Sequence, residues 1–278
     1  MAGVGVRVVT DSAAALPADV AAEHNIAVVP LGLTIGGLPV QEAALELEEL
    51  IARFDEGVRT SGPAPGDFAK AVEEAQTGDG VVVITLARDL SSTYRSAMVG
   101  SQEAAGPVEV VDSCTAAGAE GLVALAAARA AAEGRPLPEV VRVAERTRAA
   151  VRLVGALNNL EYLVKGGHIP AAAGWAAQRL NVQPVIELRD GKVRPHRPAF
   201  SREAALERLL DYWRRTIVPG CPLHLVAMHS VGTADAESLL AAVRAEVTPA
   251  TSFLSGFGTS LVAHTGPGLV GLAWYWER

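Results

Sequence analysis

The stretch VVVITL at residues 81–86 decides the fold class of this chain. Its uninterrupted apolar and β-branched side chains predict a strand that is covered on both faces, as in a parallel sheet. Strand-like and helix-like runs alternate around it, which is the pattern of strand–helix–strand units. The other strand-like runs are 6–10, 26–33 and 108–111, and the helix-like runs are 17–24, 45–53, 67–75, one from Ser91 and a long Ala-rich run. We therefore expect an α/β fold with a mostly parallel N-terminal sheet.

A second α/β pattern follows the first. The segment EGRPLP at 133–138 ends the Ala-rich helix, and one more helix precedes Val151. From there on, the chain has an apolar strand at 223–228, a helix at 234–247 and a final strand at 269–276. We predict two α/β lobes, residues 1–150 and 151–278, which form one unit with a ligand-binding cleft between them.

The bulk composition excludes several classes of protein. A net charge of −7 argues against a nucleic-acid partner, because phosphate binding draws on clustered Lys and Arg. Two cysteines, Cys114 and Cys221, make no disulfide framework. No apolar run has the length of a membrane span, and the first residues lack the features of a signal peptide. The expectation is a cytoplasmic protein without stable membrane insertion.

Four loops place hydroxyl or carboxylate side chains directly after strand-like runs: Asp11-Ser12, Thr60-Ser61, Ser91-Ser92-Thr93 and Asp112-Ser113. Such loops gather at the carboxyl edge of a parallel sheet, where ligands bind and helix N-termini favour an anion. Taken singly, each is also an ordinary helix cap. Together with the segment HTGPG at 264–268 of the second lobe, they predict a ligand with one anionic group and little else that is polar.

These segments resemble the DegV family of bacterial lipid-binding proteins in order and spacing, over essentially the whole chain. The similar segments are VTDSAAALP (9–17), TSGPAPGDF (60–68), LSSTYRSA (90–97), VVDS (110–113), NLEYLVKGGHI (159–169) and HTGPG (264–268). The resemblance implies two α/β lobes that bury a long-chain fatty acid, such as palmitate or oleate, in an apolar tunnel. It implies no other cofactor, no metal and no catalytic residue.

Some members of that family are the fatty-acid-binding subunit of a fatty acid kinase. They present the carboxylate to a separate ATP-dependent kinase subunit that forms acyl-phosphate, a step of phospholipid metabolism. Carried over residue by residue, the resemblance makes Thr60 and Ser91 the hydroxyls that bind the carboxylate, with Ser61 in support. His264 and Thr265 close the same polar end, and the glycines of the HTGPG segment let the backbone approach the head group. Arg202 is the expected contact for the kinase subunit.

Three positions depart from the family's pattern. TSQPS is TSGPA here, so Gly62 replaces an amide beside the site. SGTY is SSTY, so Ser92 replaces a glycine and either adds a donor to the head group or narrows the approach to it. GGRI is GGHI, so His168 replaces an arginine as the neighbour of the head group. An imidazole is largely neutral at pH 7, whereas a guanidinium is always charged. The change implies weaker or pH-dependent binding, or a lost kinase partnership.

A serine hydrolase is the alternative from another class. Ser91 or Ser92 would be the nucleophile, His264 the base, and Asp11 or Asp112 the residue that orients it. No G-x-S-x-G motif supports this reading. Cys114, placed after a strand, is a further candidate nucleophile that we interpret as structural. Neither a metal-binding motif nor a phosphate-binding G-x-x-x-x-G-K-[ST] loop occurs.

Overall fold

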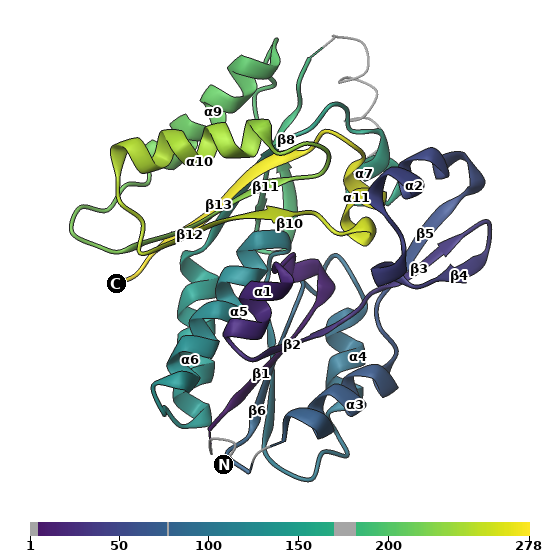
Figure 1. Cartoon of the computed structure of the whole chain (residues 1–278), viewed down its shortest axis with the longest axis vertical. Helices are drawn as coiled ribbons and strands as arrows, with labels where there is room; N and C mark the ends of the chain where they lie inside the picture. Colours follow the sequence, from purple (N-terminus) through teal and green to yellow (C-terminus); the bar gives the residue numbers. More distant parts are fainter. Residues whose placement is uncertain (1–4, 77, 170–181) are drawn as a thin grey trace.

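The computed structural model describes residues 5–76, 78–169 and 182–278 and shows two lobes, each built on its own sheet (Figure 1). In the sheet of the N-terminal lobe, every strand pairs in parallel with its neighbour. Its order is β2-β1-β6-β7, with β1 Arg7–Asp11, β2 Ile26–Val29, β6 Val81–Thr85 and β7 Val108–Asp112. All of β6 is buried, as its sequence predicts. The expected α/β class and parallel N-terminal sheet are confirmed.

Helices cover both faces of this sheet (Figure 1). Those on one face are α3 Pro65–Ala75 and α4 Thr93–Gly100, and those on the other are α5 Ala117–Ala132 and α6 Leu137–Ala150, while α1 Ala18–Glu23 precedes β2. Phe68 and Ala97 share an apolar cluster with Val83 on the first face. Val123 shares another with Val82 on the second. The alternating side chains of one strand thus anchor both helix layers.

Residues 32–61 form a small antiparallel sheet beside the parallel one, in the order β4-β3-β5. Its elements are β3 Gly32–Ile35, β4 Leu38–Val40, η2 Glu42–Ala44, α2 Leu47–Ala52, η3 Phe54–Glu56 and β5 Val58–Ser61. The expectation of one strand over 26–33 is therefore wrong. Pro30 follows β2 and has no backbone N–H to donate to a ladder, so the chain leaves one sheet there and enters another.

The C-terminal lobe has a six-stranded mixed sheet in the order β10-β9-β8-β13-β11-β12. Its strands are β8 Arg152–Ala156, β9 Val185–Arg189, β10 Lys192–Pro195, β11 Leu223–His229, β12 Thr251–Gly256 and β13 Val270–Trp276. Helices α9 Arg202–Arg214 and α10 Ala234–Glu246 cover its outer face, while α7 Glu161–Lys165 and α11 Thr259–Thr265 lie toward the small sheet (Figure 1). No helix of the described residues is long and apolar enough to cross a membrane.

Helix α5 packs against both lobes. Leu125 and Val123 belong to the cluster of the N-terminal sheet, whereas Leu122 shares a cluster with Val226 of β11. Two glycines permit this close approach. A Cβ on Gly118 would lie 2.8 Å from a methyl carbon of Val226, and one on Gly121 would lie 2.7 Å from a backbone oxygen of the N-terminal lobe. Helix α5 therefore packs against both sheets although it lies within the first predicted lobe. The boundary between the lobes at residue 150 stays a prediction.

Two carboxyl groups are fully buried together where β1 meets α5. Asp11 accepts hydrogen bonds from the backbone N–H groups of Ala13 (2.9 Å) and Leu86 (3.0 Å), and so holds the start of the loop after β6. Glu120 lies against Asp11 and accepts from Thr10 Oγ1 at 3.2 Å. Burial raises the pKa of Asp11 to about 7, and burial together with the nearby Asp11 charge raises the pKa of Glu120 well above its usual range.

Since Asp11 accepts two backbone N–H groups, which favour its ionised form, Asp11 loses its proton first, and we assign the remaining proton of this pair to Glu120. In the unfolded chain the same carboxyl ionises above about pH 4. The folded protein therefore binds more protons than the unfolded one, and the contribution of Glu120 to stability falls as the pH rises.

Glu120→Gln should test this assignment, because the amide has the size and shape of the protonated carboxyl but no longer titrates. At pH 5 its free energy of unfolding should lie within about 1 kcal/mol of the parent's. Between pH 5 and 8 the parent should lose stability relative to the variant, by at most about 1.4 kcal/mol per pH unit. Urea unfolding at several pH values measures this, and a constant difference would mean that Glu120 is ionised in the folded protein.

Candidate functional site

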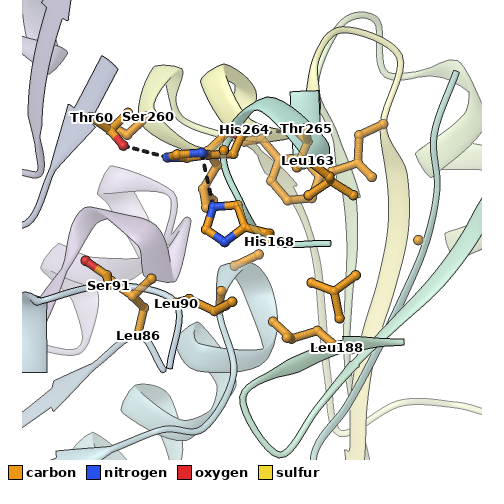
Figure 2. Close-up of a pocket in the computed structure, with 18 of the residues that line it drawn as sticks. Thr60, Leu86, Leu90, Ser91, Leu163, His168, Leu188, Ser260, His264 and Thr265 are labelled. Carbon is orange, nitrogen blue, oxygen red and sulfur yellow. Dashed lines mark hydrogen bonds between the residues drawn. The ribbon is translucent and has the colours of Figure 1, made fainter. Parts of the chain in front are cut away.

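A cavity of about 360 Å³ lies between the lobes, a size typical of small-molecule sites (Figure 2). Much of its wall is apolar, including Leu86, Leu90, Leu163, Leu188, Phe257 and Leu261. Seven residues expected near a head group all line it, namely Thr60, Ser61, Ser91, Ser92, His168, His264 and Thr265. Ser260 lines it as well. Among the described lining residues, no side chain is acidic or permanently basic.

Thr60, His264 and His168 form a linked chain across the cavity (Figure 2). Thr60 lies in β5 of the small sheet, His264 lies on α11, and His168 follows α7. Thr60 Oγ1 is 2.5 Å from His264 Nε2, and His264 Nδ1 is 3.1 Å from His168 Nε2. The two imidazoles meet edge to face with their centroids 4.7 Å apart. Both lobes therefore contribute to one polar arrangement.

Burial keeps both imidazoles uncharged at neutral pH. It lowers the pKa of His264 to about 4, with His168 adding to the effect, and it lowers the pKa of His168 as well. A chain of neutral imidazoles has two consistent proton arrangements. In one, Thr60 donates toward His264. In the other, His168 donates to His264 and His264 to Thr60, which leaves the Thr60 hydroxyl hydrogen free for a ligand oxygen.

Ser91 contributes a second hydroxyl, from the turn before α4. Its Oγ accepts a hydrogen bond from the backbone N–H of Thr93 at 3.2 Å and lies 2.8 Å from Thr93 Oγ1. Ser91 therefore binds a free backbone N–H at the start of α4, which is the ordinary structural role of a hydroxyl at a helix start. Because the Thr93 hydroxyl can supply the hydrogen of the shorter contact, the Ser91 hydrogen can still point to a ligand.

Two of the departures from the family's pattern are neighbours in space. A Cβ on Gly62 would lie 3.1 Å from Ser92 Oγ, and 2.9 Å from Thr93 Oγ1. A side chain at position 62 would therefore require the start of α4 to move. The added hydroxyl of Ser92 and the absent side chain of Gly62 fit together, and they bring the loops of Thr60 and Ser91 into contact.

Glycines shape the site in a way that differs from our expectation. Gly266 and Gly268 have positive φ, and a Cβ on them would meet Tyr162 at 2.3 Å and Asn158 at 2.1 Å. They pack the loop against the chain around α7 and are not among the cavity residues. Gly166 lies closer to the chemistry, because its Cβ would come within 2.7 Å of His264 Nδ1. Its role could be seen only once the two histidines were placed together.

The remaining sequence-predicted residues have partners of their own. Thr265 lines the cavity and donates its hydroxyl hydrogen to the Leu261 carbonyl at 3.1 Å. Toward a ligand, its hydroxyl oxygen can therefore act only as a hydrogen-bond acceptor. Arg202 begins α9, outside the cavity lining, and its Nε donates to Asp235 at 2.7 Å. This ion pair is part-buried and ties the first turns of α9 and α10 together.

A hydrolase arrangement is not assembled among the described residues. Both ring nitrogens of His264 are in contact with Thr60 and His168, not with Ser91 or Ser92. The two candidate orienting carboxylates also lie elsewhere. Asp11 accepts backbone N–H groups, as described above, and Asp112 accepts those of Arg88 and Cys114.

Cys114 lacks the environment of an activated nucleophile. Burial and the nearby Asp112 carboxylate raise the pKa of its thiol, whereas a reactive cysteine needs a lowered one. Among the residues with described structure, no group of three or more His, Cys, Asp or Glu could hold a metal ion.

The chain is similar to known proteins over nearly its whole length. The family model described as "Uncharacterised protein, DegV family" matches residues 5–277. A DegV domain-containing protein of Streptomyces coelicolor is 34% identical over 96% of this chain and 97% of its own length. A fatty acid-binding protein of Thermotoga maritima is 28% identical over 96% of each chain. A solved structure of a DegV family protein from Thermus thermophilus, described for its fatty acid binding, superposes with a TM-score of 0.90. The two sequences are 29% identical, and the match covers 98% of this chain and 99% of the other. The chain belongs to the DegV family.

Proposed function

We propose that this protein binds a long-chain fatty acid in the cavity between its lobes. The carboxylate lies at Thr60, Ser91 and His264, and the acyl chain follows the apolar wall. The observation that carries the proposal is an apolar cavity crossed by one hydroxyl–imidazole chain, with no charged side chain among its described lining residues. The Thermus thermophilus and Thermotoga maritima relatives, described as fatty acid binders, support it.

Apolar burial provides most of the binding free energy in this proposal. About 14 methylenes at roughly 0.8 kcal/mol each contribute on the order of 11 kcal/mol. Ordering the acyl chain and desolvating the carboxylate offset part of this. The hydroxyls and imidazoles therefore set the orientation of the ligand more than its affinity.

The protein purified from a bacterial host should carry about one fatty acid of roughly 14 to 18 carbons, because apolar burial at this scale slows release. Native mass spectrometry followed by lipid extraction measures this. Palmitate added to delipidated protein should raise the melting temperature, since a ligand that binds only the folded state stabilises it.

A ligand-free mass together with an unchanged melting temperature would contradict the proposal. Steady hydrolysis of a fatty ester by the isolated protein, abolished by Ser91→Ala or His264→Ala, would favour the hydrolase instead. Thioesters and p-nitrophenyl esters are suitable probes for that second measurement.

Affinity for palmitate should rise as the pH falls from about 7.5 to 6. Both imidazoles are neutral in the free protein because burial lowers their pKa values. A bound carboxylate favours the imidazolium and raises those pKa values, so that binding takes up protons, with a limit of about tenfold in affinity per pH unit for each proton taken up. His168→Arg should flatten the dependence and bind at least as tightly at pH 7.5. Calorimetric titrations across this range measure it.

His24→Gln is the matched control for this titration. His24 follows α1, is only partly buried and does not line the cavity, so its loss should leave the pH profile unchanged. An affinity that is independent of pH in the parent would place His168 away from the head group.

We further propose that the bound carboxylate is presented to a separate ATP-dependent kinase subunit that forms acyl-phosphate, as part of phospholipid metabolism. The chain then acts as a binding subunit and not as an enzyme, and a cytoplasmic location fits this role. Arg202 lies outside the cavity lining, at the first turn of α9, where it can contact such a partner without touching the ligand.

An exchange of charges should test this docking role. With a kinase subunit, ATP and palmitate supplied, Arg202→Glu should reduce acyl-phosphate formation without changing palmitate affinity. Because Arg202→Glu also faces Asp235, the double variant Arg202→Glu/Asp235→Arg restores an ion pair in reverse. Activity that recovers in the double variant would show that only the internal pair matters.

A further inference from the structure

Ser260 shares a helix face with His264. Both lie on α11, four residues apart, and side chains at this spacing are neighbours on a helix surface. Ser260 lines the same cavity as Thr60 and His264 (Figure 2). A serine within an apolar helical run has no sequence signature of its own, so Ser260 is not among the residues expected at the site.

The hydroxyl of Ser260 is buried without a partner. The residue is 2% exposed, and its Oγ has no hydrogen-bond partner among the residues that the structure describes. A buried hydroxyl that makes no hydrogen bond is costly, so its position in a ligand cavity needs a reason. A ligand oxygen would satisfy it.

The backbone of Ser260 is held in place from the other lobe. Its N–H donates to Glu42 Oε1 at 3.1 Å, and Glu42 Oε2 accepts from Ser12 Oγ at 2.5 Å. Ser12 Oγ in turn accepts the backbone N–H of Leu31 at 3.0 Å. These contacts fix the first turn of α11, and with it the direction in which the Ser260 side chain leaves the backbone.

A carboxylate has two oxygens, and each can accept more than one hydrogen bond. Thr60 has a single hydroxyl hydrogen, so it serves one acceptor. We propose that Ser260 Oγ is a further donor to the head group of the fatty acid bound in this cavity. The inference rests on the proposed function and adds to it a residue of α11 that lines the cavity and whose hydroxyl has no other partner among the described residues.

Thr259 supplies a matched control from the same helix turn. It is 6% exposed, and its Oγ1 also has no partner within the described part of the chain. Unlike Ser260, it does not line the cavity. Thr259→Val and Ser260→Ala therefore each remove one buried, unpartnered hydroxyl, and only the second removes it from a residue that lines the cavity.

The experiment compares palmitate binding by delipidated parent, Ser260→Ala, Thr259→Val and Thr60→Val. Ser260→Ala should weaken palmitate binding by about tenfold, as expected for loss of a hydrogen bond to a charged group. Without ligand, it should melt no lower than the parent, because it removes a hydroxyl that makes no bond. With saturating palmitate, it should melt lower. Thr259→Val should bind like the parent.

The possible results separate the two proposals. If Thr60→Val weakens binding and Ser260→Ala does not, Ser260 is no ligand and the fatty-acid site stands. If Ser260→Ala and Thr259→Val weaken binding equally, α11 has been disturbed and the assignment of Ser260 is overturned. If the parent itself fails to bind palmitate, the proposed function is overturned and the inference with it.

Discussion

The close packing of one helix between two sheets is the constraint on which the rest of this structure depends. Helix α5 is buried along nearly its whole length, with one side on the parallel sheet and the other on β11 and β13. Alanine and glycine are suited to this position because larger side chains would push the sheets apart, as the contacts of Gly118 show. The lobes are therefore held at a fixed separation, and the cavity between them has a defined width.

The polar part of the cavity exists only because the lobes meet. Thr60 and His264 are separated by 204 positions in the chain, yet their side chains are in contact. Each comes from a small element at the edge of its lobe, namely β5 and α11. Burial keeps His264 uncharged in the ligand-free protein, so that it acts there as a directional hydrogen-bonding group toward Thr60 and His168.

Much of the fold could be predicted from local patterns, because strands such as VVVITL and the Ala-rich helix are strongly patterned. The antiparallel sheet of residues 32–61 could not, because its strands have only three or four residues each and contain Gly32 and Pro39. The cavity residues Thr60, Ser91, His168 and His264 were accessible through family resemblance. Their mutual contacts were not, because spacing along the chain carries no information on which hydroxyl reaches which imidazole.

The two bonds of the Glu42 carboxylate have different roles, because only one of them crosses between the lobes. One oxygen accepts the N–H of Ser260 in the first turn of α11, and the other accepts from Ser12, which lies in the same lobe as Glu42. Any motion that draws α11 away from the N-terminal lobe breaks the first bond, whereas the second keeps the carboxylate aimed at α11. Glu42 therefore acts as a latch at the edge of the cavity although it is not among the residues that line it.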